Sequence, residues 1–160
     1  MMDYRGFGKS EGKITNERQL HEDLQLAYNQ LKKRFDESKI VVIGYSIGTG
    51  LAAKVASENT PRLLILQSPY YNLIDIKNKS FPILPNFILK YTLKTNEFLK
   101  ECDMPVVIFH GDKDEVIYYG SSTKLKNEFS HIEFITLKNQ SNNGMTYNPA
   151  YQTELKRILE

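Results

Sequence analysis

The chain has 160 residues but only one cysteine, and it contains no long hydrophobic run. The single cysteine, Cys102, excludes an internal disulfide and fits a reducing compartment. No apolar stretch approaches the roughly 20 residues of a transmembrane helix, and residues 1–5 do not resemble a signal peptide. These absences predict a cytoplasmic protein without a membrane span.

An excess of one charge is absent as well, because 21 Lys and Arg residues are balanced by 19 Asp and Glu residues. Short basic clusters such as residues 32–34 are typical of solvated helix faces, so we expect no nucleic-acid partner. A hydrophobic content of 41% is ordinary for one globular domain. The site predicted below uses neither a metal ion nor an organic cofactor.

Short apolar runs alternate along the chain with segments of helical periodicity. Strands are expected at residues 39–44, 62–67, 106–110 and 134–137, and helices at 16–35, 48–59, 86–91, 119–129 and 151–159. Such alternation implies an α/β fold with a mostly parallel sheet covered by helices on both faces. Ligands of these sheets bind beyond the carboxyl ends of the strands, which here are Gly44, Gln67, His110 and Lys138.

The first functional motif surrounds residue 46. The apolar run of residues 41–43 leads directly into Gly44-Tyr45-Ser46-Ile47-Gly48, and a helix-forming segment follows. A Gly-x-Ser-x-Gly turn between a strand and a helix is typical of a nucleophile elbow, whose strained turn exposes the serine hydroxyl. The helix N-terminus favours the negative charge that develops during acyl transfer. The alternative is a glycine-rich turn that only packs a helix against a strand.

Three further stretches accompany this turn: residues 3–12 (Asp-Tyr-Arg-Gly-Phe-Gly-Lys-Ser-Glu-Gly), His110-Gly111 with Asp114, and residues 143–146 (Asn-Gly-Met-Thr). Together the four stretches resemble the α/β-hydrolase family, specifically the small serine hydrolases of the α/β-hydrolase-domain 13 and 17 and Bem46 group. The resemblance implies that Ser46 is the nucleophile, that Asp114 orients the base, and that the Ile47 N–H is an oxyanion donor.

The same resemblance implies that this chain lacks the family's catalytic base. The family pattern His-Gly-x-x-Asp selects Asp114 rather than Asp112 as the acid. The family's base is a histidine in Gly-Gly-x-His-Asn after the last strand, whereas this chain has Asn-Gln-Ser-Asn-Asn at residues 139–143. Asn142 therefore stands at the histidine position, and asparagine has no basic nitrogen to accept the serine proton.

No histidine of the chain is expected to replace this base. In the family, the histidine corresponding to His110 is a structural residue at the strand end, and His21 lies among exposed positions of a helix. His131 precedes the fourth strand, which places it roughly 20 Å from the functional edge. We therefore expect little or no activity from this chain.

The resemblance also implies a domain, residues 1–160, that is N-terminally truncated. In the family, the motif at residues 3–8 follows the fourth strand of an eight-stranded sheet, and an earlier His-Gly loop provides the second oxyanion donor. Without those strands, Ile40, Val41, Val42 and Ile43 would form an exposed apolar edge, which is a template for self-association. We expect the chain alone to be unstable or to self-associate.

Residues 69–104 are predicted to form a small cap insert over the site. Its apolar residues Phe81, Leu84 and Phe87, together with Tyr45, are candidate contacts for an acyl chain. The alternative is that these residues only pack the insert onto the sheet.

These features predict a serine hydrolase of carboxylic esters or thioesters, with a small-molecule acyl substrate, that is weakly active or inactive as this chain. A non-catalytic binding protein is one alternative. A fragment that completes its sheet with another polypeptide is the other.

Overall fold

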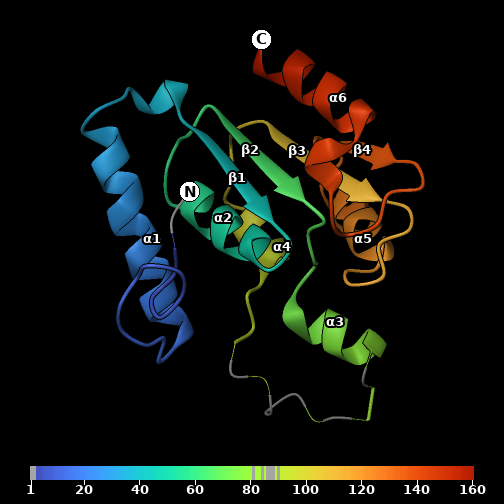
Figure 1. Ribbon diagram of the computed structural model, residues 1–160, viewed down its shortest axis with the longest axis horizontal. Coiled ribbons are helices and arrows are strands. Elements are labelled where there is room, and N and C mark those ends of the chain that lie inside the picture. Colours follow the sequence, from blue (N-terminus) through green and yellow to red (C-terminus); the bar gives the residue numbers. More distant parts are fainter. Residues whose placement is uncertain (1–2, 81, 84, 86–88, 90) are drawn as a thin grey trace.

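The computed structural model describes residues 3–80, 82–83, 85, 89 and 91–160. In this part of the chain, one sheet contains β1 (Val41–Tyr45), β2 (Leu63–Gln67), β3 (Val106–Gly111) and β4 (Glu133–Leu137). The strands lie in the order β1-β2-β3-β4, and every neighbouring pair is parallel (Figure 1). The predicted α/β fold with a parallel sheet is confirmed.

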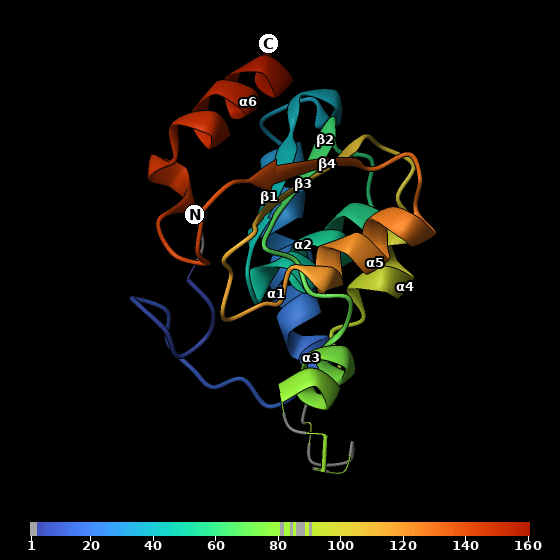
Figure 2. The same cartoon turned by 90° about the vertical axis from the view of Figure 1, so that its right-hand side faces the viewer.

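Helices cover both faces of the sheet (Figure 2). One face carries α1 (Glu17–Lys32), α2 (Gly48–Ser57), α4 (Thr95–Leu99) and α5 (Gly120–Glu128), and the other carries α6 (Pro149–Leu159). A further helix, α3 (Leu73–Ser80), lies beyond the carboxyl ends of the strands. Two 3₁₀ turns, η1 (Glu37–Lys39) and η3 (Met145–Tyr147), precede β1 and α6.

The core follows the period-two alternation of the strands. Leu64, Leu66 and Ile108 pack with Ala53 and Leu125 on the α2 and α5 side of the sheet. Their neighbours in sequence pack on the α6 side: Leu63, Ile65, Val107 and Phe109, against Tyr151. Every residue of β2 and β3 is buried, which is why these strands are apolar up to Gln67 and His110 at their carboxyl ends.

The N-terminal cap of α1 matches what its sequence predicts, but the exposure of one side chain on the helix, His21, does not. The Gln19 N–H donates to the Asn16 side chain over 2.9 Å, as expected for an N-cap. His21, expected among exposed positions, has a side chain only 15% exposed, and its ring lies edge-on to Phe98 at 5.7 Å. The expectation was wrong because Phe98 belongs to α4, a helix that the sequence did not predict.

The segment 69–104 contains α3 and α4, and both of its ends are anchored in the core. Tyr70 is fully buried and Leu99 is 2% exposed, whereas Ile83 between them is 95% exposed. α3 is tied to α5 because the Asp75 carboxylate accepts hydrogen bonds from the Tyr118 hydroxyl and the Lys124 ammonium group. A cap role for the segment stays a prediction.

Several predicted features of this segment fall on residues outside those described. These are the helix expected at residues 86–91, most of which is affected, and the candidate acyl contacts Phe81, Leu84 and Phe87. The single cysteine, Cys102, is buried in the core beside α2, and burial raises the pKa of its thiol to about 12.

β1 lies at the edge of the sheet, so one side of this strand has no strand partner among the described residues. Ile43 is 50% exposed there. None of the helices in the described part of the chain is long and apolar enough to cross a membrane.

Candidate active site

The turn between β1 and α2 holds Ser46 in a strained backbone conformation. Its φ is +49°, in the left-handed region, which costs a non-glycine residue about 1 kcal/mol. The turn is held by hydrogen bonds on both sides: the Ser46 N–H donates to the Gln67 carbonyl over 2.9 Å, and the Ser46 carbonyl accepts from the Thr49 N–H over 3.0 Å. Ser46 is half-buried at the carboxyl end of β1, and a strained serine between a strand and a helix is the geometry expected of a nucleophile elbow. The role of Ser46 as nucleophile stays a prediction.

The glycine before the serine is required by close packing of β1 on α2. A Cβ atom on Gly44 would lie 2.7 Å from the Ala52 Cβ and 2.8 Å from the Thr49 Cα. On the other side of the serine, a Cβ on Gly48 would lie 3.3 Å from the Tyr4 hydroxyl. Close packing therefore requires glycine at position 44, whereas a Cβ atom at position 48 would need only a small shift of the Tyr4 hydroxyl.

The loop that contains Tyr4 lies beside the elbow and is stabilised by its own turns. The Lys9 N–H donates to the Asp3 carboxylate over 3.1 Å, and Arg5 forms a two-pronged ion pair with Asp23 of α1. This loop is the first of the four stretches that the sequence singled out, and the fold brings it against α2 although about 40 residues of sequence separate them.

The first turn of α2 is fixed by a tyrosine that the sequence analysis missed. The fully buried Tyr70 hydroxyl donates to the Ile47 carbonyl over 2.9 Å and accepts from the Gly50 N–H over 3.1 Å. The Ile47 N–H itself has no acceptor among the described residues, as required of an oxyanion donor. Tyr70 lies shortly after the carboxyl end of β2. This position beyond a strand end is the sequence feature from which a role at the site could have been predicted.

Asp114 follows β3 and is held by several donors. One carboxylate oxygen accepts from the N–H groups of Val116 (2.9 Å) and Ile117 (2.8 Å). The other lies 3.0 Å from the Asn142 side-chain nitrogen and 3.3 Å from the His110 Nε2. The competing Asp112 instead accepts from the Asn139 N–H over 2.7 Å and so positions the loop after β4.

The carboxyl of Asp114 is ionised at neutral pH. Burial raises its pKa, but the hydrogen bonds from His110, the Ile117 N–H and Asn142 outweigh burial and bring the pKa to about 2. The nearby Ser68 hydroxyl also favours the charged form, although it is buried and has no hydrogen bond of normal geometry in the described part of the chain. A buried negative charge therefore faces Asn142.

Asn142, which is 6% exposed, has partners at both ends of its side-chain amide. Its nitrogen donates to Asp114, and its oxygen lies 3.0 Å from the Tyr45 hydroxyl. The same hydroxyl lies 2.8 Å from the Asn142 main-chain carbonyl. Burial and the Asp114 charge raise the pKa of Tyr45, so this hydroxyl acts as a donor. The structure thus forms a continuous row Tyr45–Asn142–Asp114 beside the elbow.

This row contains two of the three predicted catalytic positions, Asp114 and Asn142, but not the third, Ser46. Among the described residues, the Ser46 hydroxyl forms no hydrogen bond with Asn142. His110 lies close by but is fully buried, with its Nδ1 2.6 Å from the Ser122 hydroxyl and its Nε2 2.8 Å from the Ile117 carbonyl. Its ring nitrogens are therefore occupied. The described residues also contain no group of three or more His, Cys, Asp or Glu side chains that could hold a metal ion.

Comparison with known proteins identifies the family. Residues 1–97 match the family model described as "Serine aminopeptidase, S33". The chain belongs to this α/β-hydrolase family. The matched residues include the elbow and Ser46 but neither Asp114 nor Asn142.

Relatives of the family match over most of the chain. Protein bem46 of Schizosaccharomyces pombe is 32% identical over 125 residues, which are 73% of this chain and 42% of that protein. The human α/β-hydrolase domain-containing protein 17B is 26% identical over 98% of this chain and 54% of its own length. The chain spans about half the length of the curated relatives it matches.

Solved structures with low sequence identity share the fold. An esterase from Pyrococcus furiosus superposes with a TM-score of 0.74 at 20% identity, over 98% of this chain and 67% of that one. A serine hydrolase homologue from Coxiella burnetii superposes with a TM-score of 0.65 at 24% identity, over 97% of this chain and 64% of that one. These identities support the fold and not a shared activity.

Proposed function

We propose that this chain is a serine-hydrolase unit for carboxylic esters or thioesters in which replacement of the base by Asn142 leaves little or no activity. The observation that carries the proposal is the row Tyr45–Asn142–Asp114 beside a strained Ser46. In this proposal Ser46 is the nucleophile, Asp114 the acid and the Ile47 N–H the oxyanion donor, and an amide, Asn142, stands on Asp114 where the family has its histidine.

In the proposed chemistry, the Ser46 hydroxyl attacks the acyl carbonyl and the Ile47 N–H stabilises the oxyanion. Attack requires a base that removes the hydroxyl proton, and an amide cannot do so at neutral pH. Asp114 cannot act directly, because its pKa near 2 makes it a weak base and one of its oxygens already accepts a hydrogen bond from Asn142. A site without one triad member retains about 10³–10⁴-fold acceleration over water.

Labelling with a fluorophosphonate tests the proposal. We expect the native chain to react slowly, Asn142→His to react about 100-fold faster at pH 7.5, and Asn142→His combined with Ser46→Ala not to react. The matched control is Asn143→His, at the adjacent exposed position, which should react like the native chain. Rapid labelling of Ser46 in the native chain would contradict the missing base.

Two alternatives remain as proposals beside this one. The two-sided anchoring of Asn142 favours a non-catalytic binding protein, because the amide then serves to hold the loop after β4. That hypothesis predicts that Asn142→His still gives no labelling. The free edge at Ile40, Val41, Val42 and Ile43 favours a unit that completes its sheet by self-association or with another polypeptide. The acyl contacts of Tyr45, Phe81, Leu84 and Phe87 also stay proposed, as does a cytoplasmic location.

A further inference from the structure

Asn143 and Gly144 form the one Asn-Gly pair of the chain, and the pair lies beside the row Tyr45–Asn142–Asp114. Both residues are exposed, in the loop between β4 and η3. Gly144 has a φ of +75°, and nothing lies within 4 Å of the point that its Cβ would occupy. Its N–H has no acceptor among the described residues. Neither a side chain nor a hydrogen bond therefore shields this peptide nitrogen.

The side-chain amide of Asn143 is held by a single long contact. Its oxygen lies 3.3 Å from the Tyr45 hydroxyl, and its nitrogen has no partner in the described part of the chain. Asn142, by contrast, is buried and held at both ends of its amide. The Asn143 main-chain carbonyl accepts from the side chains of Gln140 (2.8 Å) and Ser141 (3.3 Å), which fixes the following peptide group. The Asn143 side chain is thus free to turn toward the next peptide nitrogen.

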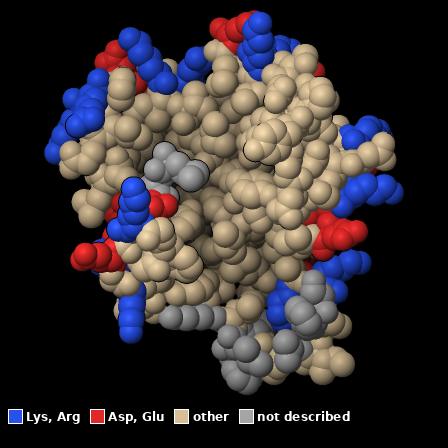
Figure 3. Space-filling view, in the orientation of Figure 1, with Lys and Arg blue, Asp and Glu red and all other residues tan. Residues whose placement is uncertain are grey.

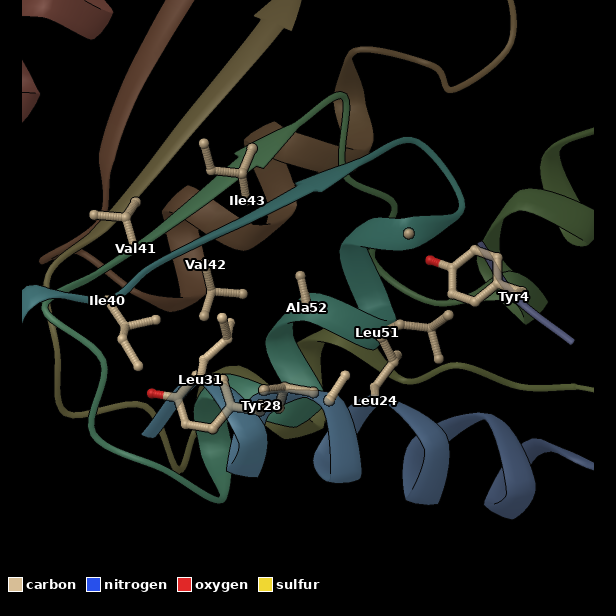
Figure 4. A pocket seen from close by; sticks show the side chains of 13 residues that line it. Tyr4, Leu24, Tyr28, Leu31, Ile40, Val41, Val42, Ile43, Leu51 and Ala52 are labelled. Atoms are coloured by element: carbon tan, nitrogen blue, oxygen red, sulfur yellow. The ribbon is translucent and has the colours of Figure 1, made fainter. Parts of the chain in front are cut away.

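Tyr45 reaches this loop because of the side of β1 on which it lies. In Figure 4, Val42 points toward α1 and α2, whereas Val41 and Ile43 point to the opposite side of the strand. Since side chains alternate along a strand, Tyr45 shares the side of Val41 and Ile43, where the segment between β4 and α6 also lies (Figures 1 and 2). Charged side chains lie mainly around the rim of this face in Figure 3, and its centre is uncharged. A new carboxylate on this face would therefore meet few charged groups that compete for the Tyr45 hydroxyl.

The open peptide nitrogen and the loosely held amide can react with each other and then with water. The Gly144 nitrogen attacks the Asn143 Cγ and gives up its proton, the bond from Cγ to Nδ2 breaks, and Nδ2 leaves as ammonia with that proton. Water then opens the resulting cyclic imide at one of its two carbonyls, which leaves aspartate or isoaspartate at position 143. The net reaction consumes one water and releases one ammonia. Glycine favours the ring closure because it has no Cβ to hinder the approach.

The product changes the competition for one hydroxyl proton. The Tyr45 hydroxyl has a single proton to donate, and three oxygens surround it: the Asn142 carbonyl at 2.8 Å, the Asn142 side-chain oxygen at 3.0 Å and the Asn143 side-chain oxygen at 3.3 Å. A carboxylate at position 143 is a stronger acceptor than an amide oxygen, since charge-assisted hydrogen bonds are roughly twice as strong as neutral ones. The Tyr45 hydroxyl would then turn from Asn142 to residue 143.

We propose that Asn143 deamidates spontaneously in the folded chain and that the new carboxylate takes the Tyr45 hydroxyl from Asn142. The isoaspartyl product also inserts one CH₂ group into the backbone directly after Asn142. The reaction uses water and needs neither the Ser46 hydroxyl nor a base at position 142. Its tests measure no ester cleavage and no labelling of Ser46, so the proposal stands or fails independently of the proposed hydrolase function.

Peptide mapping by mass spectrometry tests the modification in the full chain. After incubation at neutral pH, an aspartyl or isoaspartyl residue should be found at position 143, and the formal net charge should fall from +2 to +1, which cation exchange detects. Gly144→Ala should slow the conversion roughly tenfold or more, because a Cβ hinders ring closure. Gly12→Ala, at another exposed glycine with a positive φ (+93°), should not slow it. Asn143 that stays intact in the folded chain for as long as the chain in urea takes to convert, or equal conversion at Asn142, would overturn the proposal.

Titration of Tyr45 tests the change of hydrogen-bond partner. Asn143→Asp gives the aspartyl product directly, and ¹³C-labelled tyrosine with Tyr45→Phe identifies the signal. Burial and the Asp114 charge already raise the pKa of Tyr45, and Asn143→Asp should raise it further, because its carboxylate would hold the hydroxyl proton. Thr146→Asp adds the same charge at an exposed position of the same segment and should have a smaller effect. An unchanged pKa in Asn143→Asp, or an equal rise in both variants, would overturn the transfer of the hydroxyl.

Discussion

Gly44 is the residue at which the elbow tolerates least change. A methyl group there would overlap Ala52 and Thr49 at 2.7–2.8 Å, and both belong to a helix that cannot shift without moving the whole turn. Gly44→Ala should therefore lower the free energy of unfolding by about 2–3 kcal/mol, as measured by urea denaturation.

The control for this change is Gly144→Ala, since Gly144 has a φ of +75° but nothing lies within 4 Å of the point that its Cβ would occupy. It should cost only the conformational penalty of about 1 kcal/mol. Equal losses in the two variants would show that the close contacts at Gly44 cost no more than the backbone penalty at Gly144, and would contradict the packing argument.

The Asp114 carboxyl should make stability depend on pH in the acidic range. Its pKa in the folded chain is about 2, below the ordinary value of 3.8, so the folded state favours the ionised form. The stabilisation is fully present above about pH 5 and is lost as the pH falls through 2, and it amounts to roughly 2 kcal/mol.

Urea unfolding of the native chain and of Asp114→Asn between about pH 7 and pH 2 measures this contribution. The difference between the two proteins should be constant above about pH 5 and should shrink below about pH 4. Other carboxyl groups titrate in both proteins, so only the difference reports on Asp114. A difference that does not change with pH would mean that the carboxyl is not held in its ionised form.

At the scale of elements, the first turn of α2 depends on one side chain from the loop after β2. Tyr70→Phe removes the hydroxyl that bridges the partly buried Ile47 carbonyl and the buried Gly50 N–H, and leaves both groups without this partner. We expect a loss of about 1–3 kcal/mol in unfolding free energy. Tyr147→Phe, at a tyrosine that is 84% exposed, should change stability by less than about 0.5 kcal/mol.

If the two tyrosine variants were equally stable, the buried hydroxyl would contribute nothing to the turn. The same pair of variants tests whether the Tyr70 hydroxyl positions the Ile47 N–H for the reaction or only stabilises the fold. In the Asn142→His background, Tyr70→Phe should slow fluorophosphonate labelling, because Ile47 is then less firmly held, and Tyr147→Phe should leave the rate unchanged.

Elements with a strong local pattern were predictable, and short polar ones were not. All four strands lie within one or two residues of their expected bounds. Short runs rich in β-branched residues and leucine are typical of strands buried inside a parallel sheet, so their positions can be predicted from the sequence. α3 and α4 were missed. They contain 8 and 5 residues, and contacts with α5 and α2 stabilise them more than any pattern of their own.

At the scale of the whole molecule, the exposed edge of β1 should govern behaviour on heating. Partial unfolding leaves an apolar, uncharged strand edge available for pairing between molecules. Ile43→Lys, at a side chain that is 50% exposed, should reduce light scattering after heating by roughly twofold or more, with little change in melting temperature.

Ile83→Lys adds the same charge at an isoleucine that is 95% exposed and far from β1 in sequence, and it should not protect. If both lysines protected equally, net charge rather than the strand edge would control aggregation. A sharp, reversible transition of the native chain without scattering would contradict the role of the edge altogether.

The class of fold follows from the amino-acid sequence alone, because strand periodicity is a local property of the chain. The roles predicted for Ser46, Asp114 and Asn142 also need only the sequence, since they are implied by motifs that resemble those of a known family. What these residues touch follows only from the folded arrangement. Folding joins Asn142 to Tyr45 and Asp114 across 97 and 28 positions of sequence. It also buries His110 with Ser122 and the Ile117 carbonyl as partners, and it places the Tyr70 hydroxyl against the Ile47 carbonyl. Such contacts depend on how strand ends converge at one edge of the sheet, which no local pattern encodes.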